Sequence, residues 1–292
     1  MAEQISKKTY ALLNKLPPPA LKALKIFYAP FRYKKALKQA KKSYKCFGQN
    51  YSNNILLIAG LPKSGTTWVE NMLLSFRGFT IVPDPNVTRW GYRNKGSHQY
   101  ELSMEFFRQL NDALVLYKEH FHGSLNNVNI IKQLNLPYLI IYRDLRDASV
   151  SHVHYVKRTK WHPEYPEYSK KNIQEGLVHF GETLLPEWRN WIESWKQNRD
   201  LDRSIIVKYE DMKKNPVLVF GKILKCFDLP ADNIEKIIDE NRFDKMKKKS
   251  SFFRKGTTGD WINHFDEEAK SIFKKEIGEF LIEEGYETGL EW

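Results

Sequence analysis

The sequence predicts an α/β fold in which a single domain has a central parallel β-sheet flanked by helices. Three apolar runs, at residues 55–59, 138–142 and 204–208, have the length and composition of buried strands. Patterns of helical period separate these runs, and a strand that is followed by a helical crossover joins its neighbour in parallel. The strand runs and the helices between them together indicate the fold class.

The helix boundaries can also be predicted from the sequence. The helical pattern after the first strand should end at Gly78, because glycine commonly follows a helix. Asn215 is the expected N-cap of a helix that starts with proline. A closing helix is expected from Asp266 to about Glu284, followed by Gly285 as its cap.

The segment between the first strand and its helix has the features of a phosphate-binding loop. It reads Gly60-Leu61-Pro62-Lys63-Ser64-Gly65-Thr66-Thr67-Trp68. Glycines let the backbone pass close to a phosphate, and the start of a helix offers unpaired N–H groups. The spacing resembles the nucleotide-triphosphatase loop G-x-x-x-x-G-K-[ST], but Thr66 stands where that loop has its lysine. Lys63 lies inside the loop instead, so the segment predicts an anion site of a different kind.

A second anion site is predicted at the end of the strand 138–142. Arg143 follows this strand directly, and Ser151 comes eight residues later. Because ligands bind at the carboxyl ends of parallel strands in open α/β sheets, Arg143 should emerge beside the first loop. The alternative is that Arg143 and Asp147 form an ordinary surface ion pair one helical turn apart.

Two further segments carry candidate binding residues. The string Phe253-Arg254-Lys255-Gly256-Thr257-Thr258-Gly259-Asp260-Trp261 places two adjacent cations on a flexible backbone, which suits a phosphate. Tyr209 follows the strand 204–208, and Phe243 opens the segment Phe243-Asp244-Lys245-Met246-Lys247-Lys248. Aromatic rings at these positions could stack on a purine, although either could instead belong to the core.

Together these segments resemble the motifs of the cytosolic-type sulfotransferases, which use 3′-phosphoadenosine 5′-phosphosulfate (PAPS) as sulfuryl donor. P-K-S-G-T-T-W is similar to the 5′-phosphosulfate loop of that family, and R-K-G-x-x-G-D-W is similar to its 3′-phosphate signature. The resemblance implies a P-loop-like phosphosulfate-binding loop. It assigns donor binding to Lys63, Ser64, Gly65, Thr66, Thr67, Trp68, Arg143, Ser151, Tyr209, Phe243, Arg254, Lys255 and Gly256, with Trp68, Tyr209 and Phe243 around the adenine.

The catalytic residues follow from a further similarity, between Lys118-Glu119-His120 and the K-x-H segment of the family. Sulfuryl transfer is an in-line displacement, so positioning and electrostatics supply most of the catalysis. His120 is the expected general base, since a neutral imidazole with an ordinary pKa of roughly 6.5 can take the acceptor proton. Lys118 would lie beside the sulfonate, and Lys63 would stabilise charge on the leaving phosphate. Ser151 would either restrain Lys63 or bind the 3′-phosphate.

Composition limits the remaining possibilities. The chain has 292 residues, of which 41% are hydrophobic, and no segment approaches the ~20 apolar residues of a membrane span. Two cysteines and no signal-peptide pattern predict a cytoplasmic enzyme. No metal is expected, because lysine and arginine neutralise the phosphates and no group of ligand residues has metal-site spacing.

The positive charge is concentrated in residues 1–50, which we treat as a basic helical leader before a sulfotransferase domain at 51–292. The leader holds twelve of the 47 basic residues and one acidic residue, and therefore +11 of the net charge of +12. An apolar stripe recurs there at helical spacing, through Tyr33, Leu37, Ala40, Tyr44 and Phe47. We expect this stripe to pack on the body. A peripheral contact with an anionic membrane is the alternative, and no nucleic-acid partner is expected.

The acceptor is predicted only as a small molecule with a hydroxyl or amine. Its pocket is expected from the stretch around Trp90 and Tyr100, or from residues 161–168. A kinase-like ATP phosphotransferase is a second hypothesis, disfavoured by Thr66 and by the two 3′-phosphate motifs. A non-catalytic protein that binds through the leader is a third, disfavoured by the catalytic set. The dimer motif of the family has no clear match after Trp261, so the oligomeric state is open.

Overall fold

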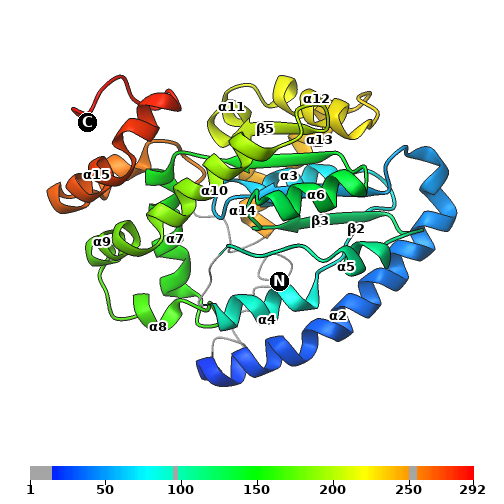
Figure 1. Ribbon diagram of the computed structural model, residues 1–292, viewed down its shortest axis with the longest axis horizontal. Coiled ribbons are helices and arrows are strands. Elements are labelled where there is room, and N and C mark those ends of the chain that lie inside the picture. The colour runs from blue at the N-terminus through cyan, green and yellow to red at the C-terminus, as the bar shows by residue number, and fades with distance from the viewer. Residues whose placement is uncertain (1–14, 95–97, 250–254) are drawn as a thin grey trace.

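The computed structural model describes residues 15–94, 98–249 and 255–292, which form a five-stranded sheet between helices (Figure 1). The strands are β1 (Ile55–Gly60), β2 (Thr80–Ile81), β3 (Val115–Glu119), β4 (Tyr138–Tyr142) and β5 (Ser204–Lys208), in the spatial order β2-β3-β1-β4-β5. All neighbouring pairs are parallel. The predicted α/β fold is confirmed, and the three predicted strands are β1, β4 and β5.

The central strands are buried on both faces, which explains why their sequences lack the polar alternation of half-exposed strands. In β1, Leu57 and Ala59 point into one hydrophobic core, whereas Leu56 and Ile58 point into the other. All four side chains are fully buried.

Helices cover both faces of the sheet. The core that contains Leu56 includes α3 (Thr66–Leu73), α11 (Tyr209–Lys214), α12 (Pro216–Phe227) and α13 (Ile234–Glu240). The other core includes α5 (Met104–Arg108), α6 (Leu125–Gln133), α7 (Leu145–Arg158), α9 (Ile173–Thr183), α10 (Leu185–Asn198) and α15 (Glu267–Glu283). The remaining described helices are α2 (Pro18–Phe47), η2 (Gly48–Asn50), α4 (Pro85–Arg93), α8 (Tyr165–Tyr168), α14 (Phe243–Lys249) and η3 (Asp260–Asn263).

The predicted helix boundaries hold in part. α15 has Asp266 as its N-cap, whose carboxylate accepts from the N–H of Ala269, and Gly285 follows with a φ of 69°. Asn215 is the N-cap of α12, but its side chain makes no capping hydrogen bond. The predicted end of α3 at Gly78 is wrong. α3 stops at Leu73, because the N–H groups of Ser75 and Phe76 donate to carbonyls only three residues back, at Met72 and Leu73, and so form turns that do not continue the α-helix.

The long helix α2 runs along the lower edge of the molecule in Figure 1, beside α4. Its predicted apolar stripe packs inward: Ala40 is fully buried, and Tyr33 and Leu37 lie against the same core. The N–H of Leu114 donates to the carbonyl of Ala40 at 3.2 Å, which ties the helix to the start of β3. Most lysines of α2 are exposed.

The strand order places a topological switch point at β1. The chain goes from β1 to the edge strand β2, returns to β3 beside β1, and then crosses to β4 and β5 on the other side. In open α/β sheets a ligand binds outside the carboxyl ends of the strands at such a point. The loop after Gly60 begins there.

Candidate active site

The loop between β1 and α3 folds tightly over the end of β1. Lys63 and Gly65 both have left-handed backbone conformations, with φ of 64° and 80°. A Cβ at Gly60 would lie 2.1 Å from Cγ2 of Thr66, and one at Gly65 would lie 2.5 Å from the ring of Tyr209. These approaches explain why both positions are glycine. α3 then begins at Thr66, with its N-terminal N–H groups at the loop.

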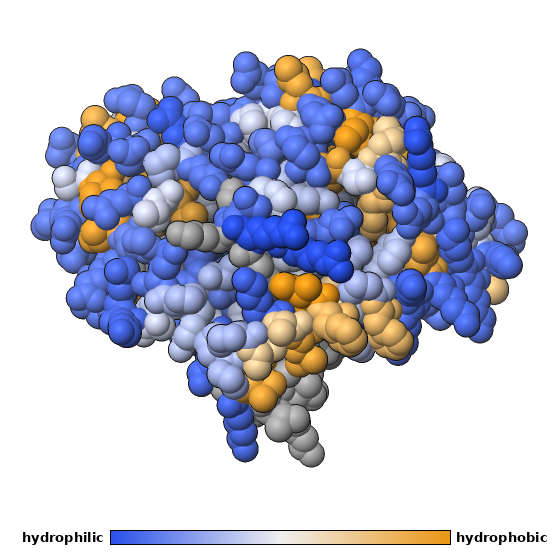
Figure 2. All heavy atoms as spheres, turned by 60° about the horizontal axis from the view of Figure 1, so that its bottom comes forward, coloured by the Kyte–Doolittle hydropathy of each residue, from blue (hydrophilic) through white to orange (hydrophobic). Residues whose placement is uncertain are grey.

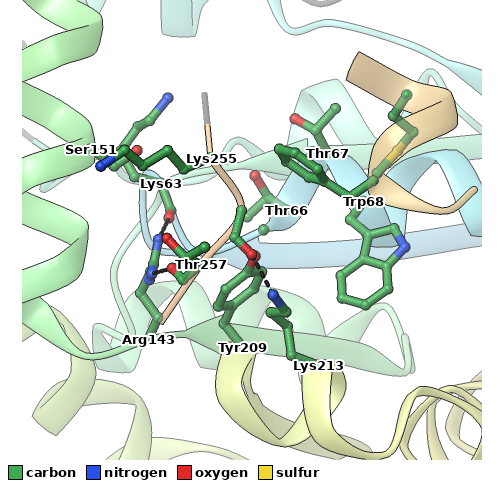
Figure 3. Close-up of a pocket in the computed structure, with 14 residues that line it drawn as sticks. Lys63, Thr66, Thr67, Trp68, Arg143, Ser151, Tyr209, Lys213, Lys255 and Thr257 are labelled. Atoms are coloured by element: carbon green, nitrogen blue, oxygen red, sulfur yellow. Dashed lines mark hydrogen bonds between the residues drawn. The ribbon is translucent and has the colours of Figure 1, made fainter. Parts of the chain in front are cut away.

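A pocket opens at this helix terminus (Figure 3). Four of the described residues that line it are cations, and none of them is acidic; the lining residues are Lys63, Gly65, Thr66, Thr67, Trp68, Arg143, Ser151, Tyr209, Lys213, Phe243, Met246, Lys255, Gly256 and Thr257. The structure thus brings together residues predicted from four separate segments. Ser64 is fully buried and does not line the pocket.

Arg143 is held by partners from three segments. Its Nη2 donates to Asp147 at 2.9 Å and to the carbonyl of Thr257 at 3.0 Å, and its Nη1 donates to the carbonyl of Lys63 at 3.4 Å. Asp147 also accepts from the N–H of Gly259 at 2.7 Å and of Trp261 at 3.0 Å. Burial raises the pKa of the Asp147 carboxyl, although Arg143 opposes the shift. The Arg143–Asp147 pair is therefore a buried crosslink between the strand end and the 255–261 segment.

The 255–261 segment closes one side of the pocket. Gly256 has a φ of 67°, and a Cβ there would lie 2.5 Å from the ring of Phe243. Nζ of Lys213 donates to the carbonyl of Gly256, and Lys255 pairs with Asp260 at 2.8 Å. Arg254 lies outside the described residues.

Aromatic side chains form the other side. The rings of Trp68 and Tyr209 meet edge to face, with centroids 6.3 Å apart. The guanidinium of Arg143 lies 4.6 Å from the centre of the Tyr209 ring, which also packs against Gly65. Tyr209 therefore contacts both the loop and Arg143, and it lines the pocket together with Trp68 and Phe243.

His120 follows β3 and lies beside Gly60, where the loop begins, although neither His120 nor Lys118 is among the residues that line the pocket. Residues 58 and 59 of β1 are paired with 118 and 119 of β3, so His120 lies beside Gly60. Its Nδ1 is 2.5 Å from the carbonyl oxygen of Gly60. A carbonyl only accepts, so Nδ1 carries the proton and Nε2 presents the lone pair. The indole N–H of Trp191 donates to the backbone carbonyl of His120 at 3.0 Å and fixes the chain.

Lys118 forms an ion pair with Glu70 of α3, at 2.6 Å between Nζ and Oε2. The Glu70 side chain is only 2% exposed. Glu70 was not predicted, since no local motif connects a residue of α3 with the end of β3. Lys213, Met246 and Thr257 were also missed as pocket residues.

Several residues of the two predicted acceptor stretches are buried, and the assignment of the acceptor pocket to these stretches stays a prediction. The Tyr100 hydroxyl is buried and donates to Asp84 at 2.9 Å. Trp161 and Glu164 are buried as well, and Glu164 pairs with His152 at 2.8 Å. The ring of His98 lies edge-on to that of His120, at a centroid distance of 5.7 Å.

The His152–Glu164 pair sits in a cluster with strongly shifted protonation. Burial opposes ionisation of Glu164, but the charge and hydrogen bond of His152 outweigh it and lower the pKa of the carboxyl to about 2. Burial lowers the pKa of His162 to about 3, so this imidazole is neutral at physiological pH. These residues, at α7 and α8, shape the structure on the His120 side of the sheet.

Comparison with known proteins adds independent information. A family model described as "Sulfotransferase domain" matches residues 54–284. Sulfotransferase 1A1 of Rattus norvegicus is 28% identical over 235 residues, which cover 72% of this chain and 78% of that protein. Sulfotransferase 1B1 of Canis lupus familiaris is 29% identical over 260 residues, covering 76% and 83%.

Solved structures show the same fold. Mouse sulfotransferase SULT7A1, solved with PAP, has a TM-score of 0.57 at 19% identity and covers 85% of this chain and 95% of its own. Retinol dehydratase, solved with androsterone and PAP, has a TM-score of 0.56 at 20% identity, covering 82% and 85%. At this level of identity, the likeness is evidence for the fold.

In residues 15–94, 98–249 and 255–292, no helix combines the length and apolar character that crossing a bilayer requires. The same ranges contain no group of three or more His, Cys, Asp or Glu residues arranged to hold a metal ion.

Proposed function

Because this chain belongs to the sulfotransferase family, we propose that its four-cation pocket holds PAPS and that His120 activates the acceptor. The enzyme transfers a sulfuryl group from PAPS to a small-molecule acceptor. The hypotheses of an ATP phosphotransferase and of a non-catalytic binding protein are therefore rejected. One observation carries the site assignment: residues from four distant segments line one pocket that is rich in cations and, among the described residues, lacks any carboxylate.

The 5′-phosphosulfate would lie at the N-terminus of α3. Thr66 and Thr67 line the pocket there, and helix N–H groups attract an anion. Lys63 lines the same pocket, with Nζ 4.0 Å from the centre of the Tyr155 ring. A lysine at this position would stabilise the charge that develops on the leaving phosphate oxygen.

The 3′-phosphate would lie between Arg143, Ser151 and Lys255. All three line the pocket, on the side away from the Trp68 ring in Figure 3. Arg143 already has its guanidinium oriented by Asp147, so ligand binding need not order it. Arg254 is proposed to complete this set, on the basis of its place beside Lys255 in the sequence.

The adenine would lie between Trp68 and Phe243, where ring faces offer stacking to a purine. Tyr209 would support this site through its contacts with the loop and with Arg143. Its contacts with Gly65 and Arg143 make it a support that holds the loop and the guanidinium in register.

His120 would act as the general base through Nε2, because its Nδ1–H donates a hydrogen bond to the Gly60 carbonyl and the lone pair of the neutral ring is then on Nε2. In the transfer, the acceptor oxygen or nitrogen forms a bond to sulfur as the bond from sulfur to the phosphate oxygen breaks. The acceptor proton passes to His120, and the leaving nucleotide keeps the electron pair near Lys63. Lys118 would neutralise the sulfonate oxygens, with Glu70 holding its ammonium in place before the donor binds.

The test is sulfuryl transfer from PAPS to a panel of phenols, alcohols and amines, with His120→Ala and His122→Ala compared. His122 is a matched control, because it lies two residues further along and pairs with Glu101 at 3.4 Å. We expect His120→Ala to lower kcat by about 10²–10⁴-fold and His122→Ala to leave it nearly unchanged. Similar losses in both variants would contradict the assignment of the base.

A further inference from the structure

The outward side of α2 has a surface that donor binding and sulfuryl transfer do not use. It begins with large exposed apolar side chains: Leu24 is 46% exposed, Phe27 85%, Tyr28 44% and Phe31 59%. Their spacing of three and four residues puts them on one side of the helix. Figure 2, which brings the lower edge of Figure 1 to the front, shows hydrophobic side chains gathered on this face next to hydrophilic ones.

The same side of the helix continues as a row of cations. The exposed lysines after Phe31 are Lys34, Lys35, Lys38, Lys41, Lys42 and Lys45. No aspartate or glutamate occurs anywhere in α2. The helix is about 45 Å long, at 1.5 Å for each residue. Its outward side therefore has an apolar end, residues 24–31, and a lysine end, residues 34–45.

We propose that this side of α2 docks the enzyme on an anionic lipid bilayer. The apolar end would enter the boundary between headgroups and acyl chains, where aromatic and aliphatic side chains are favoured. The lysine end would lie along the headgroups, where each basic residue near an anionic surface strengthens binding. Each end matches one component of such a membrane.

The shape and charge of the surface favour lipid over other occupants. The exposed apolar side chains at residues 24–31 come from one helix, and a bilayer can accommodate such a helix face without a matching groove. A second copy of this chain docked through the same face would set each lysine end against lysines or apolar side chains of the partner helix, since α2 has no acidic residue to pair with them. Nucleic acid would use the lysines but would leave Phe27 without an apolar partner.

The inward side of α2 relates this surface to the active site. Lys25 interacts electrostatically with Glu119, the residue before His120, and with His162. Lys25 belongs to the apolar end of α2, so this end of the helix lies near the chain segment that leads to His120. A docked enzyme would hold its acceptor side close to the lipid.

The experiment is sedimentation of the full chain with vesicles of phosphatidylcholine, alone or with about 30% phosphatidylserine. Three variants are compared with the wild type: Phe27→Ser/Phe31→Ser, Lys34→Gln/Lys35→Gln/Lys38→Gln, and Leu201→Ser/Leu218→Ser. The last removes two apolar side chains that are 72% and 58% exposed elsewhere, so it is the matched control. Sulfuryl transfer in solution checks that each variant is folded.

We expect the wild type to bind only the anionic vesicles, and each of the two α2 variants to bind about tenfold or more weakly. The control variant should bind like the wild type, and all four proteins should be equally active without vesicles. Absence of wild-type binding would overturn the proposal. So would binding that the phenylalanine variant does not weaken, since the charge alone would then explain it.

Two other occupants would be detected in the same experiment. Self-association through this face would appear as a wild-type dimer that Phe27→Ser/Phe31→Ser dissociates in sedimentation velocity. Coverage by the preceding segment would appear as vesicle binding that occurs only after residues 1–14 are deleted. Either result would also overturn the proposal, whereas the sulfotransferase assignment would stand as long as transfer activity is retained.

Discussion

The donor pocket and the outward side of α2 both depend on basic residues, but they organise them in opposite ways. In the pocket, Arg143 has three hydrogen-bonded partners, and Lys255 pairs with Asp260. On α2, the lysines from Lys34 to Lys45 are exposed, and the helix has no acidic residue. Partners fix the direction of each pocket cation, so it can recognise one ligand atom. The α2 lysines together produce a field that attracts any anionic surface.

This contrast predicts how each region responds to substitution. Removing one cation or its partner from the pocket should have a large effect on ligand binding or on kcat, because the neighbouring groups are no longer held in position. Removing one lysine from α2 should have a small effect, since the others still contribute to the field.

Among substitutions in these two basic regions, the largest effect is expected for Lys63→Met. Loss of the charge beside the leaving phosphate oxygen should lower kcat by about 10²–10³-fold. Lys34→Met is the matched control, because it removes the same charge from an exposed position of α2 and should leave kcat unchanged. Steady-state kinetics with PAPS would measure both. Equal changes in kcat at the two positions would contradict the claim that a pocket lysine acts individually whereas an α2 lysine acts only as part of a group.

A smaller effect is expected for Asp147→Asn. Asp147 accepts from Arg143, Gly259 and Trp261, and the neutral amide would replace a charged acceptor at a buried position. We expect the Kd for adenosine 3′,5′-bisphosphate to rise about tenfold, as measured by calorimetry. Asp239→Asn provides a control, because Asp239 is exposed and pairs with Lys245 at the surface. An unchanged Kd for Asp147→Asn would mean that the crosslink does not organise the pocket.

The smallest effect concerns stability in mild acid. The pKa of His162 is lowered to about 3 in the folded protein, below its ordinary value of 6.5, so the unfolded chain binds this proton first. Stability is therefore greatest above pH 6.5 and falls as the pH decreases toward 3. Between pH 6 and 5, His162 should account for about 1 kcal/mol of the loss. The carboxyl of Glu164 should add to it below its ordinary pKa of 4.5.

Urea unfolding across this pH range would measure the effect. His162→Asn should flatten the pH dependence between 6 and 5, whereas Lys34→Gln/Lys35→Gln/Lys38→Gln should retain the wild-type slope. Lysines stay charged in both states over this range, so the α2 variant serves as the control. A His162→Asn profile parallel to that of the wild type would exclude the imidazole as the titrating group.

Local patterns were sufficient to predict the central strands and the loop. β1 and β4 are apolar runs buried on both faces, and β5 is an apolar run at the edge of the sheet that is only partly buried. The loop residues are adjacent in the sequence. β2 was missed because it is two residues long, and β3 because it ends in charged residues. Glu70 and the bonds of Asp147 to residues 259 and 261 connect parts of the chain that only the fold brings together.

The sequence of α2 illustrates a second limit. It contains two apolar sets at helical spacing, one through Ala40 and one through Phe27. Periodicity predicts a helix from either set, but it does not tell which set is buried. The structure buries Ala40 and leaves Phe27 85% exposed.

The most direct test of the donor site is calorimetric binding of adenosine 3′,5′-bisphosphate and of 5′-AMP to the wild type and to Lys255→Ala. The two nucleotides differ only in the 3′-phosphate, and Lys255 lines the side of the pocket assigned to that phosphate. We predict that the Kd of the wild type is about a hundredfold lower for the bisphosphate than for 5′-AMP. In Lys255→Ala this ratio should fall to about tenfold, while the Kd for 5′-AMP stays the same. Equal binding of the two nucleotides by the wild type would contradict the assignment of this pocket to PAPS.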